Sequence, residues 1–229
     1  LTGQIYEGEE QIEWNPETMQ WYSCEFTVET TNSMHGEYFI SGVATDLDGL
    51  WDEFSENEYW FFNPIISLGI SGQIEFEKLR PGSVSTSSVL TIKNNAEENS
   101  GVLLDMFIAG TDFYDSTHSG AMCPESNVLR LTNFEYYASL GAYNTCDYPG
   151  ASPICYVDIP YFVDGAGDIG NNNMQRIING TPTSFGVYPA GNVLSPGSNM
   201  NINFKLHLPE PCNAEIFDQG QIFFYGEAI

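Results

Sequence analysis

The chain has 229 residues, and 31 acidic residues against six basic ones give it a formal net charge of −25. This balance excludes nucleic acid as a partner, because binding to phosphate groups needs clustered Lys and Arg side chains. The length favours one large domain with an extension over two separate domains.

The N-terminal segment is acidic and alternates in character. Leu1, Gly3 and Ile5 share one face of an extended strand, and Ile12 and Trp14 share a face farther along. No proline interrupts residues 1–14, so this segment can join a sheet. An ordinary first strand or a frayed tail of its own domain is the alternative. The first 77 residues contain no Lys or Arg, and they repel one another unless salt, divalent cations or low pH screen them.

Two strands are expected next, over residues 22–30 and 37–43, and the stretch ATDLDGLWDEFSENE (residues 44–58) follows them as a candidate metal site. Its carboxylates are hard ligands of the kind that Ca²⁺ prefers, and Gly49 permits a sharp turn. The candidate ligands are Asp46, Asp48, Asp52 and Glu53. Their spacing departs from the EF-hand pattern, so a solvated acidic loop is an equal alternative. The later stretch GTDFYDSTHSG adds Asp112 and Asp115 as a second candidate.

The middle of the chain reads as strands over residues 65–76, 89–93 and 102–108, separated by turn residues. The stretch NFEYYASL predicts a short helix over residues 133–140, with Asn133 or Thr132 as its N-cap. The Gly- and Asn-rich residues 161–184 predict an irregular loop. Within it, Asn179 begins an Asn-Gly-Thr sequon and is a candidate for N-glycosylation.

The clearest strand is the strict alternation of Met200, Ile202, Phe204, Leu206 and Leu208. It predicts one buried face and one solvent face, with Lys205 and His207 on the solvent face. Another strand is expected over residues 221–229. Two similar turns, Pro81-Gly82 and Pro196-Gly197, each offer a glycine for the positive φ of a type II turn, and each is expected to introduce a core strand on opposite parts of one sandwich.

The five cysteines show no spacing typical of a zinc site, which favours disulfides in an oxidising compartment. Cys146 and Cys155 lie in one Pro- and Gly-containing loop and are expected to pair locally. Cys123 and Cys212 are then expected to pair across the sequence. Cys24 is left over, either as a buried thiol or in an intermolecular bond.

These patterns together predict an all-β fold, a jelly-roll-like β-sandwich with long irregular loops and an N-terminal extension. We expect residues 1–20 to form the extension and residues 21–229 a single domain. No Gly-x-Ser-x-Gly, His-Glu-x-x-His or phosphate-loop motif is present, so we expect no enzymatic activity and no required cofactor, with calcium as the candidate ion. The chain begins at Leu1 without Met and has no apolar run of 18 residues, which favours a mature secreted form that does not span a membrane.

The Leu-x-Pro-Gly turn at residues 79–82, the strand that ends at residues 91–95 in Asn-Asn, and the next strand at residues 103–108 carry a family resemblance. They resemble the core of the TasA and camelysin family of biofilm fibre subunits and the related archaeal bundling-pilus and surface-layer proteins. The segment from residue 201 to residue 226 is similar to the last core strands of that family, and the likeness covers about two fifths of the chain. The acidic extension of roughly 60 residues and the cysteine set depart from it.

The resemblance implies a jelly roll that polymerises by donor-strand complementation, in which an N-terminal strand completes the sheet of the next copy. We therefore expect a secreted structural subunit of an extracellular, cell-surface filament whose partners are other copies of itself. The alternative is a monomeric surface module that binds a glycan or a protein, with its contact formed by the four tryptophans Trp14, Trp21, Trp51 and Trp60.

Overall fold

The computed structural model describes residues 5–7, 10–12, 17, 36–62, 64–77, 79–98, 100–124, 126–147, 155–163, 173–180, 188–213 and 216–229. Strands dominate these residues, and the helical segments among them are short 3-10 turns: η1 (Leu131–Asn133), η2 (Thr145–Asp147) and η4 (Ala190–Asn192). The predicted all-β class is therefore confirmed. The predicted strand over residues 22–30 and the domain boundary at residue 20 lie outside the described residues.

The larger of two facing sheets has the strand order β12 (Tyr143–Asn144), β11 (Phe134–Leu140), β16 (Asn199–His207), β7 (Leu90–Asn94) and β5 (Leu68–Ser71). β13 (Val157–Asp158) also pairs with β11, and β6 (Val84–Thr86) pairs with β16. The smaller sheet is built around β8 (Leu104–Gly110), with β14 (Gln175–Arg176), β15 (Val193–Leu194) and β17 (Ile222–Ala228) as its neighbours. All of these pairs are antiparallel, as β-sandwiches commonly have them.

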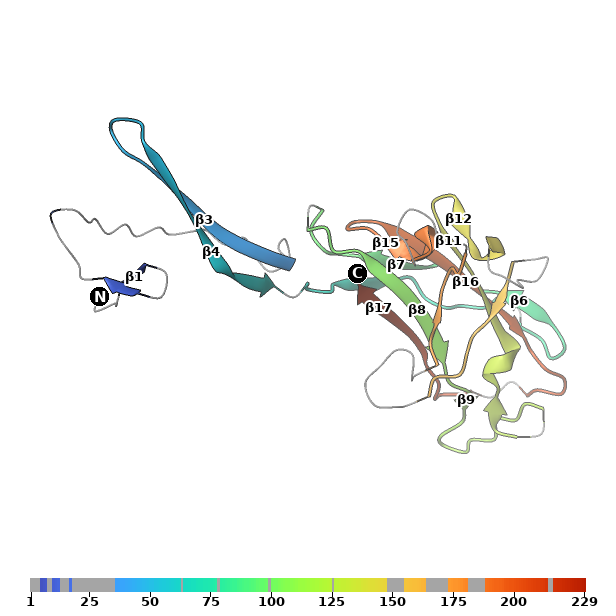
Figure 1. The fold of residues 1–229 in the computed structure, drawn as a ribbon. Helices are drawn as coiled ribbons and strands as arrows, with labels where there is room; N and C mark the ends of the chain where they lie inside the picture. The colour runs from blue at the N-terminus through green and yellow to red at the C-terminus, as the bar shows by residue number, and fades with distance from the viewer. Residues whose placement is uncertain are drawn as a thin grey trace.

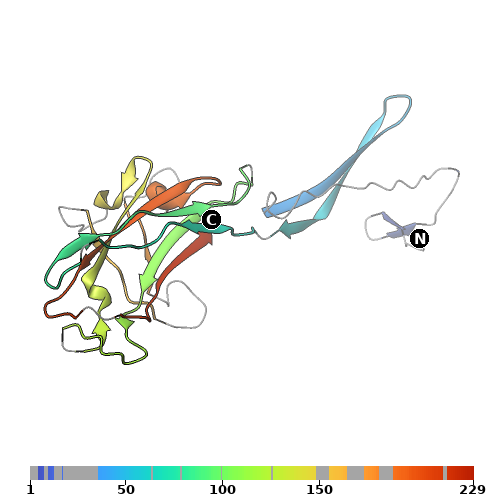
Figure 2. The same cartoon turned by 180° about the vertical axis from the view of Figure 1, so that it is seen from behind.

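The core lies between the two sheets, whose ribbons Figures 1 and 2 show from opposite sides. Ile92, Met200 and Ile202 from the larger sheet and Met106 and Ile108 from the smaller one are fully buried in it. Every residue of β8 is buried, because its second face is covered too. There Asp105 accepts hydrogen bonds from Arg176 Nε and Asn192 Nδ2, at 2.8 and 2.7 Å.

Three further strand pairs lie outside the two sheets. β9 (Phe113–Tyr114) pairs with β10 (Val128–Leu129), and β1 (Ile5–Glu7) pairs with β2 (Glu10–Ile12). The third pair is a long hairpin of β3 (Gly36–Thr45) and β4 (Trp51–Phe62), which projects away from the sandwich (Figures 1 and 2). The strand β4 was not expected from the sequence.

The helix predicted over residues 133–140 is wrong, because these residues form β11. Their burial alternates with a period of two: Phe134, Tyr136 and Ala138 are buried in the core, whereas the residues between them are half-buried on the other face. Pairing with β16 over six residues fixes this strand. Tertiary pairing has thus overridden a local pattern that favoured a helix.

The strand predicted around residues 200–208 is confirmed in its buried face but wrong at one position of the other face. Lys205 is only 6% exposed, although the alternation placed it toward solvent. Its ammonium pairs with Glu135 on the neighbouring strand and lies 4.3 Å from the ring centroid of Tyr156. The exposed His207 also lies 3.1 Å from Glu135 through its Nε2 atom.

The two Pro-Gly turns have the same backbone bond. Ser83 N–H donates to Arg80 C=O and Ser198 N–H donates to Ser195 C=O, both at 2.9 Å, and φ is +74° at Gly82 and +77° at Gly197. The positive φ expected of type II turns is confirmed. The turns do not lie on opposite parts of the sandwich, however, because the strands that follow them are neighbours in one sheet.

Candidate functional site

The outer edge of β17 has no strand beside it among the described residues. Thr111 N–H donates to Gln221 C=O and Ile229 N–H donates to Leu103 C=O, so the odd-numbered residues of β17 bond toward β8. In an antiparallel pair the intervening residues point their N–H and C=O groups the other way. These are Ile222, Phe224, Gly226 and Ala228, whose backbone groups form an open edge.

The two sheets also differ in width next to this edge. Ile70 of β5 lies opposite Ile92, which lies opposite Met200, and directly paired residues share a face of the sheet. Ile92 and Met200 are fully buried, whereas Ile70 is 54% exposed. The core-facing side of the larger sheet thus continues past the point where the described part of the smaller sheet ends.

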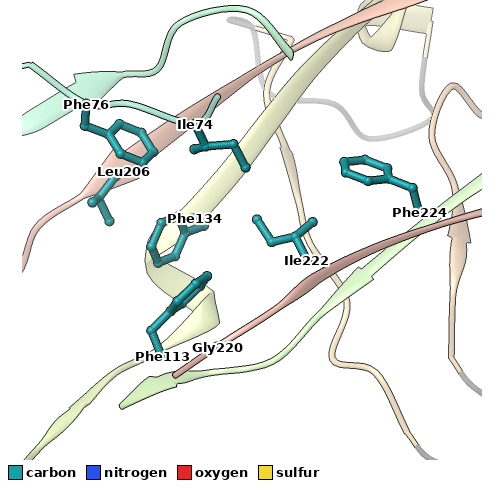
Figure 3. A pocket seen from close by; sticks show the side chains of 8 residues that line it. All are labelled: Ile74, Phe76, Phe113, Phe134, Leu206, Gly220, Ile222 and Phe224. Carbon is teal, nitrogen blue, oxygen red and sulfur yellow. The ribbon is translucent and has the colours of Figure 1, made fainter. Parts of the chain in front are cut away.

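An apolar cavity, here named the edge groove, lies between the sheets beside β17. Its volume is about 350 Å³, and Figure 3 shows the eight residues that line it: Ile74, Phe76, Phe113, Phe134, Leu206, Gly220, Ile222 and Phe224. The ring of Phe134 contacts Phe76 and Phe113, with centroid distances of 6.1 and 4.9 Å. Ile74 is 38% exposed at the rim, so the groove is open to solvent there.

The glycine of the groove makes room for an aromatic ring. Gly220 has φ +152°, and a Cβ atom at this position would overlap the ring of Phe113. None of the eight lining residues has a titratable side chain. The groove therefore suits apolar side chains as occupants, and the unpaired backbone beside it suits an extended chain. No pattern in the sequence predicts this groove.

In the acidic stretch of residues 44–58, residues 46–50 form the turn of the β3–β4 hairpin and the residues after them belong to β4. Asp46 Oδ1 accepts hydrogen bonds from the N–H groups of Asp48 and Leu50, at 2.9 and 2.8 Å, and Asp52 accepts one from Glu53 N–H. Gly49 supplies a φ of +84° there, which agrees with the predicted sharp turn. Within the described residues, no three His, Cys, Asp or Glu side chains are placed to hold a metal ion.

The second pair of metal candidates stabilises loops. Asp112 Oδ1 accepts hydrogen bonds from Leu131 N–H and from the hydroxyl of Tyr161, at 2.7 and 2.6 Å. The carboxylate of Asp115 accepts hydrogen bonds from residues 117–121 of its own loop. Calcium binding by either set of carboxylates stays a prediction.

Both predicted disulfides, Cys123–Cys212 and Cys146–Cys155, are present. Cys24 lies outside the described residues, as do Leu1, Gly3, Trp14 and Trp21. Within the predicted donor strand, Ile5 of β1 pairs with Ile12 of β2, so this part of the segment forms a short hairpin. Asn179 is half-buried after the buried Ile177 and Ile178, and its use as a glycosylation site stays a prediction.

No known family model matches this chain, and a search of curated proteins finds no match either. Across the parts of the chain described above, no helix is long and apolar enough to cross a membrane. The features of the described chain that bear on function are the edge groove, the open edge of β17 and the exposed hairpin.

Proposed function

We propose that this protein is a secreted structural subunit of an extracellular filament. In this proposal, a strand from residues 1–14 of one copy pairs with the open edge of β17 in the next copy. Its apolar side chains fill the edge groove of that copy. The observation that carries the proposal is the open outer edge of the seven-residue strand β17 with an apolar groove beside it.

The energies are sufficient for a stable contact. Burying one large apolar side chain contributes ~1.5–3 kcal/mol, so four of them contribute on the order of 10 kcal/mol before ordering costs. The strand would leave a β1–β2 hairpin with three residues in each strand, and an isolated hairpin of this size is only marginally stable. The exchange therefore gives up little in the donor copy.

Two disulfides are consistent with an oxidising, extracellular setting, in which thiol-reducing systems are scarce. They also constrain the loops around the sandwich while one strand position is left for a neighbour. Adjacent copies of so acidic a chain repel one another. A homopolymer can form when salt or cations screen this repulsion.

The test is a charge placed in the groove region without disturbing the fold. Ile70→Asp puts a carboxylate on the core-facing side of β5 at a position that is already 54% exposed, so the folded monomer should tolerate it. We expect this variant to form no filaments by negative-stain electron microscopy and no large particles by light scattering. Deletion of residues 1–14 should have the same effect.

Met122→Asp is the matched control, because Met122 is an apolar residue that is 50% exposed and does not line the edge groove. It should assemble as the unmodified chain does. Filaments of normal length from Ile70→Asp, with an unchanged thermal unfolding curve, would falsify strand docking at this edge.

One observation favours a second candidate, a monomeric surface module that binds a glycan or protein. Trp51 is 68% exposed on the hairpin, and exposed tryptophans are common at binding surfaces. The two candidate functions predict different molecular masses in solution. A stable monomer at high protein concentration and moderate salt, measured by light scattering, would favour the binding module.

A further inference from the structure

The β3–β4 hairpin presents apolar side chains that nothing in the described residues covers. Every residue from Ser41 to Glu53 is exposed. The most exposed large apolar ones, here named the hairpin tip, are Val43, Leu47, Leu50 and Trp51, with exposures between 64% and 106%. A cluster of this kind on a projecting two-stranded hairpin is typical of an interaction surface.

The backbone of the hairpin holds this surface in place. Thr45 pairs with Trp51 and Val43 pairs with Glu53, so Val43 and Trp51 lie on the same face of the hairpin. Asp46 fixes the turn by accepting the two hydrogen bonds described above, and Asp46 N–H donates to Leu50 C=O at 2.8 Å. The tip is thus an ordered surface with a tryptophan in it, and tryptophan is among the residues that contribute most to protein interfaces.

Charge limits what can pack on the tip. Residues 36–62 contain seven acidic residues and no Lys or Arg: Glu37, Asp46, Asp48, Asp52, Glu53, Glu56 and Glu58. If two hairpins were in contact, their carboxylates would lie close together, and the repulsion between like charges would be unfavourable. The partner surface must therefore lack acidic side chains.

One such surface exists on the sandwich of the same chain. The acid-free face, as we name it here, is formed by the outward side chains of β7 and of the first five residues of β16: Thr91, Lys93, Asn199, Asn201 and Asn203. None of them is acidic, and Lys93 is exposed. The nearest carboxylate on the next strand, Glu135, is already paired with Lys205 and His207. In a chain with net charge −25, this face is complementary to the hairpin tip.

We propose that the hairpin tip of one copy docks on the acid-free face of a second copy. The hairpin points away from its own sandwich in both views, so the face it reaches belongs to another molecule (Figures 1 and 2). The two surfaces differ, so the contact is heterologous and can repeat from copy to copy. The inference rests on the proposed function, because it adds a second contact to the same assembly.

The experiment exchanges the charges across the contact. Lys93→Glu and Glu53→Lys are each expected to raise the protein concentration needed for assembly by up to about fivefold, as for an exposed ion pair. Glu53→Lys is informative because it lowers the net negative charge, so general repulsion alone predicts easier assembly. The double variant should assemble at the original concentration.

Arg130→Glu is the control for Lys93→Glu, because it makes the same charge change at another exposed position. Equal effects of these two variants, or a double variant no better than the single ones, would overturn the inference. Trp51→Ser, which leaves all charges in place, should weaken assembly at least as much as Lys93→Glu.

The groove variant separates this contact from strand docking. In Ile70→Asp protein, sedimentation equilibrium should still detect a weak self-association that Lys93→Glu removes. If Ile70→Asp protein shows no self-association that Lys93→Glu can reduce, the hairpin contact is wrong while strand docking stands. If Ile70→Asp protein forms full filaments, strand docking is wrong and the charge exchange still decides the hairpin contact.

Discussion

Single residues show why acidic side chains in this chain should not be read as metal ligands from their spacing alone. Asp115 is 1% exposed, and its two oxygens accept five hydrogen bonds from Thr117, Ser119, Gly120 and Ala121. Burial by itself would raise the pKa of this carboxyl group. The hydrogen bonds outweigh burial and lower the pKa from 3.8 to about 2.

The first prediction concerns acid stability. Because the pKa of Asp115 is lower in the folded chain than its ordinary value, its stabilising effect is present above about pH 4 and is lost as the pH falls toward 2. Asp115→Asn should lower the stability of the monomer near pH 6, and its stability should depend less on pH below 4. Urea unfolding between about pH 2 and pH 6 measures both effects. Asp48→Asn, at an exposed turn position, is the control and should leave the curve unchanged.

Lys205 shows where alternation fails at the residue scale. The period of two correctly predicts that Met200, Ile202, Phe204 and Leu206 are buried. It also predicts that Lys205 lies on the solvent side, which is wrong. It could not show that Glu135 of β11 and Tyr156, just before β13, would cover the lysine. Those contacts depend on pairing between strands that are far apart in sequence.

At the scale of elements, the two Pro-Gly turns tie neighbouring strands together. Gly82 N–H donates to Leu208 C=O just after β16, and Gly197 N–H donates to Asn94 C=O at the end of β7, at 2.9 and 2.8 Å. Each turn thus begins one strand segment and bonds to the end of its neighbour. The repeated motif therefore connects neighbouring strands of one sheet through backbone hydrogen bonds.

The second prediction follows from the positive φ of these glycines. Gly197→Ala should lower the free energy of unfolding by about 1 kcal/mol, because an L-residue is disfavoured in this region. A Cβ atom there meets only Glu98 side-chain atoms at 3.8 and 3.9 Å, so crowding adds little. Gly197→Asn should cost less than alanine, since asparagine tolerates this conformation better. Urea unfolding of both variants gives the comparison, and an equal loss in the two would contradict the backbone explanation.

The strands β16, β17 and β3 could be predicted from the sequence, and of these β16 has the strict period of two. β11 was predicted as a helix because the stretch NFEYYASL contains a cap residue and good helix formers, whereas its cross-strand partners come from residues 199–207 and 157–158. Residues 44–58 were interpreted as a candidate metal site or a solvated acidic loop because of their carboxylates and Gly49, whereas residues 51–58 belong to β4. In both cases the missing information was the pairing partner.

At the scale of the whole molecule, the edge groove could not be predicted because it arises from a mismatch between two sheets. Its lining combines residues 74–76, residues 113 and 134, residue 206 and residues 220–224. Each of these segments looks like ordinary core in the sequence. Only the register that exposes Ile70 opposite the buried Ile92 shows that the sandwich is open at this edge.

The net charge of −25 sets the conditions under which copies of this chain can meet. Repulsion between like-charged copies reaches about 30 Å at 0.01 M salt and about 8 Å at 0.15 M. We therefore predict that assembly, followed by light scattering, becomes faster as NaCl is raised over this range. The same dependence should hold for the Met122→Asp control.

Calcium at matched ionic strength then separates screening from a specific site. If screening alone matters, Ca²⁺ and Mg²⁺ should accelerate assembly alike, because both carry the same charge. If the carboxylates of the hairpin or of the Asp112 and Asp115 loops bind calcium, Ca²⁺ should act at lower concentration than Mg²⁺ and should also raise the melting temperature of the Ile70→Asp monomer. Since Asp46, Asp112 and Asp115 already accept hydrogen bonds from their own loops, we expect equal acceleration by the two ions and a melting temperature that does not change.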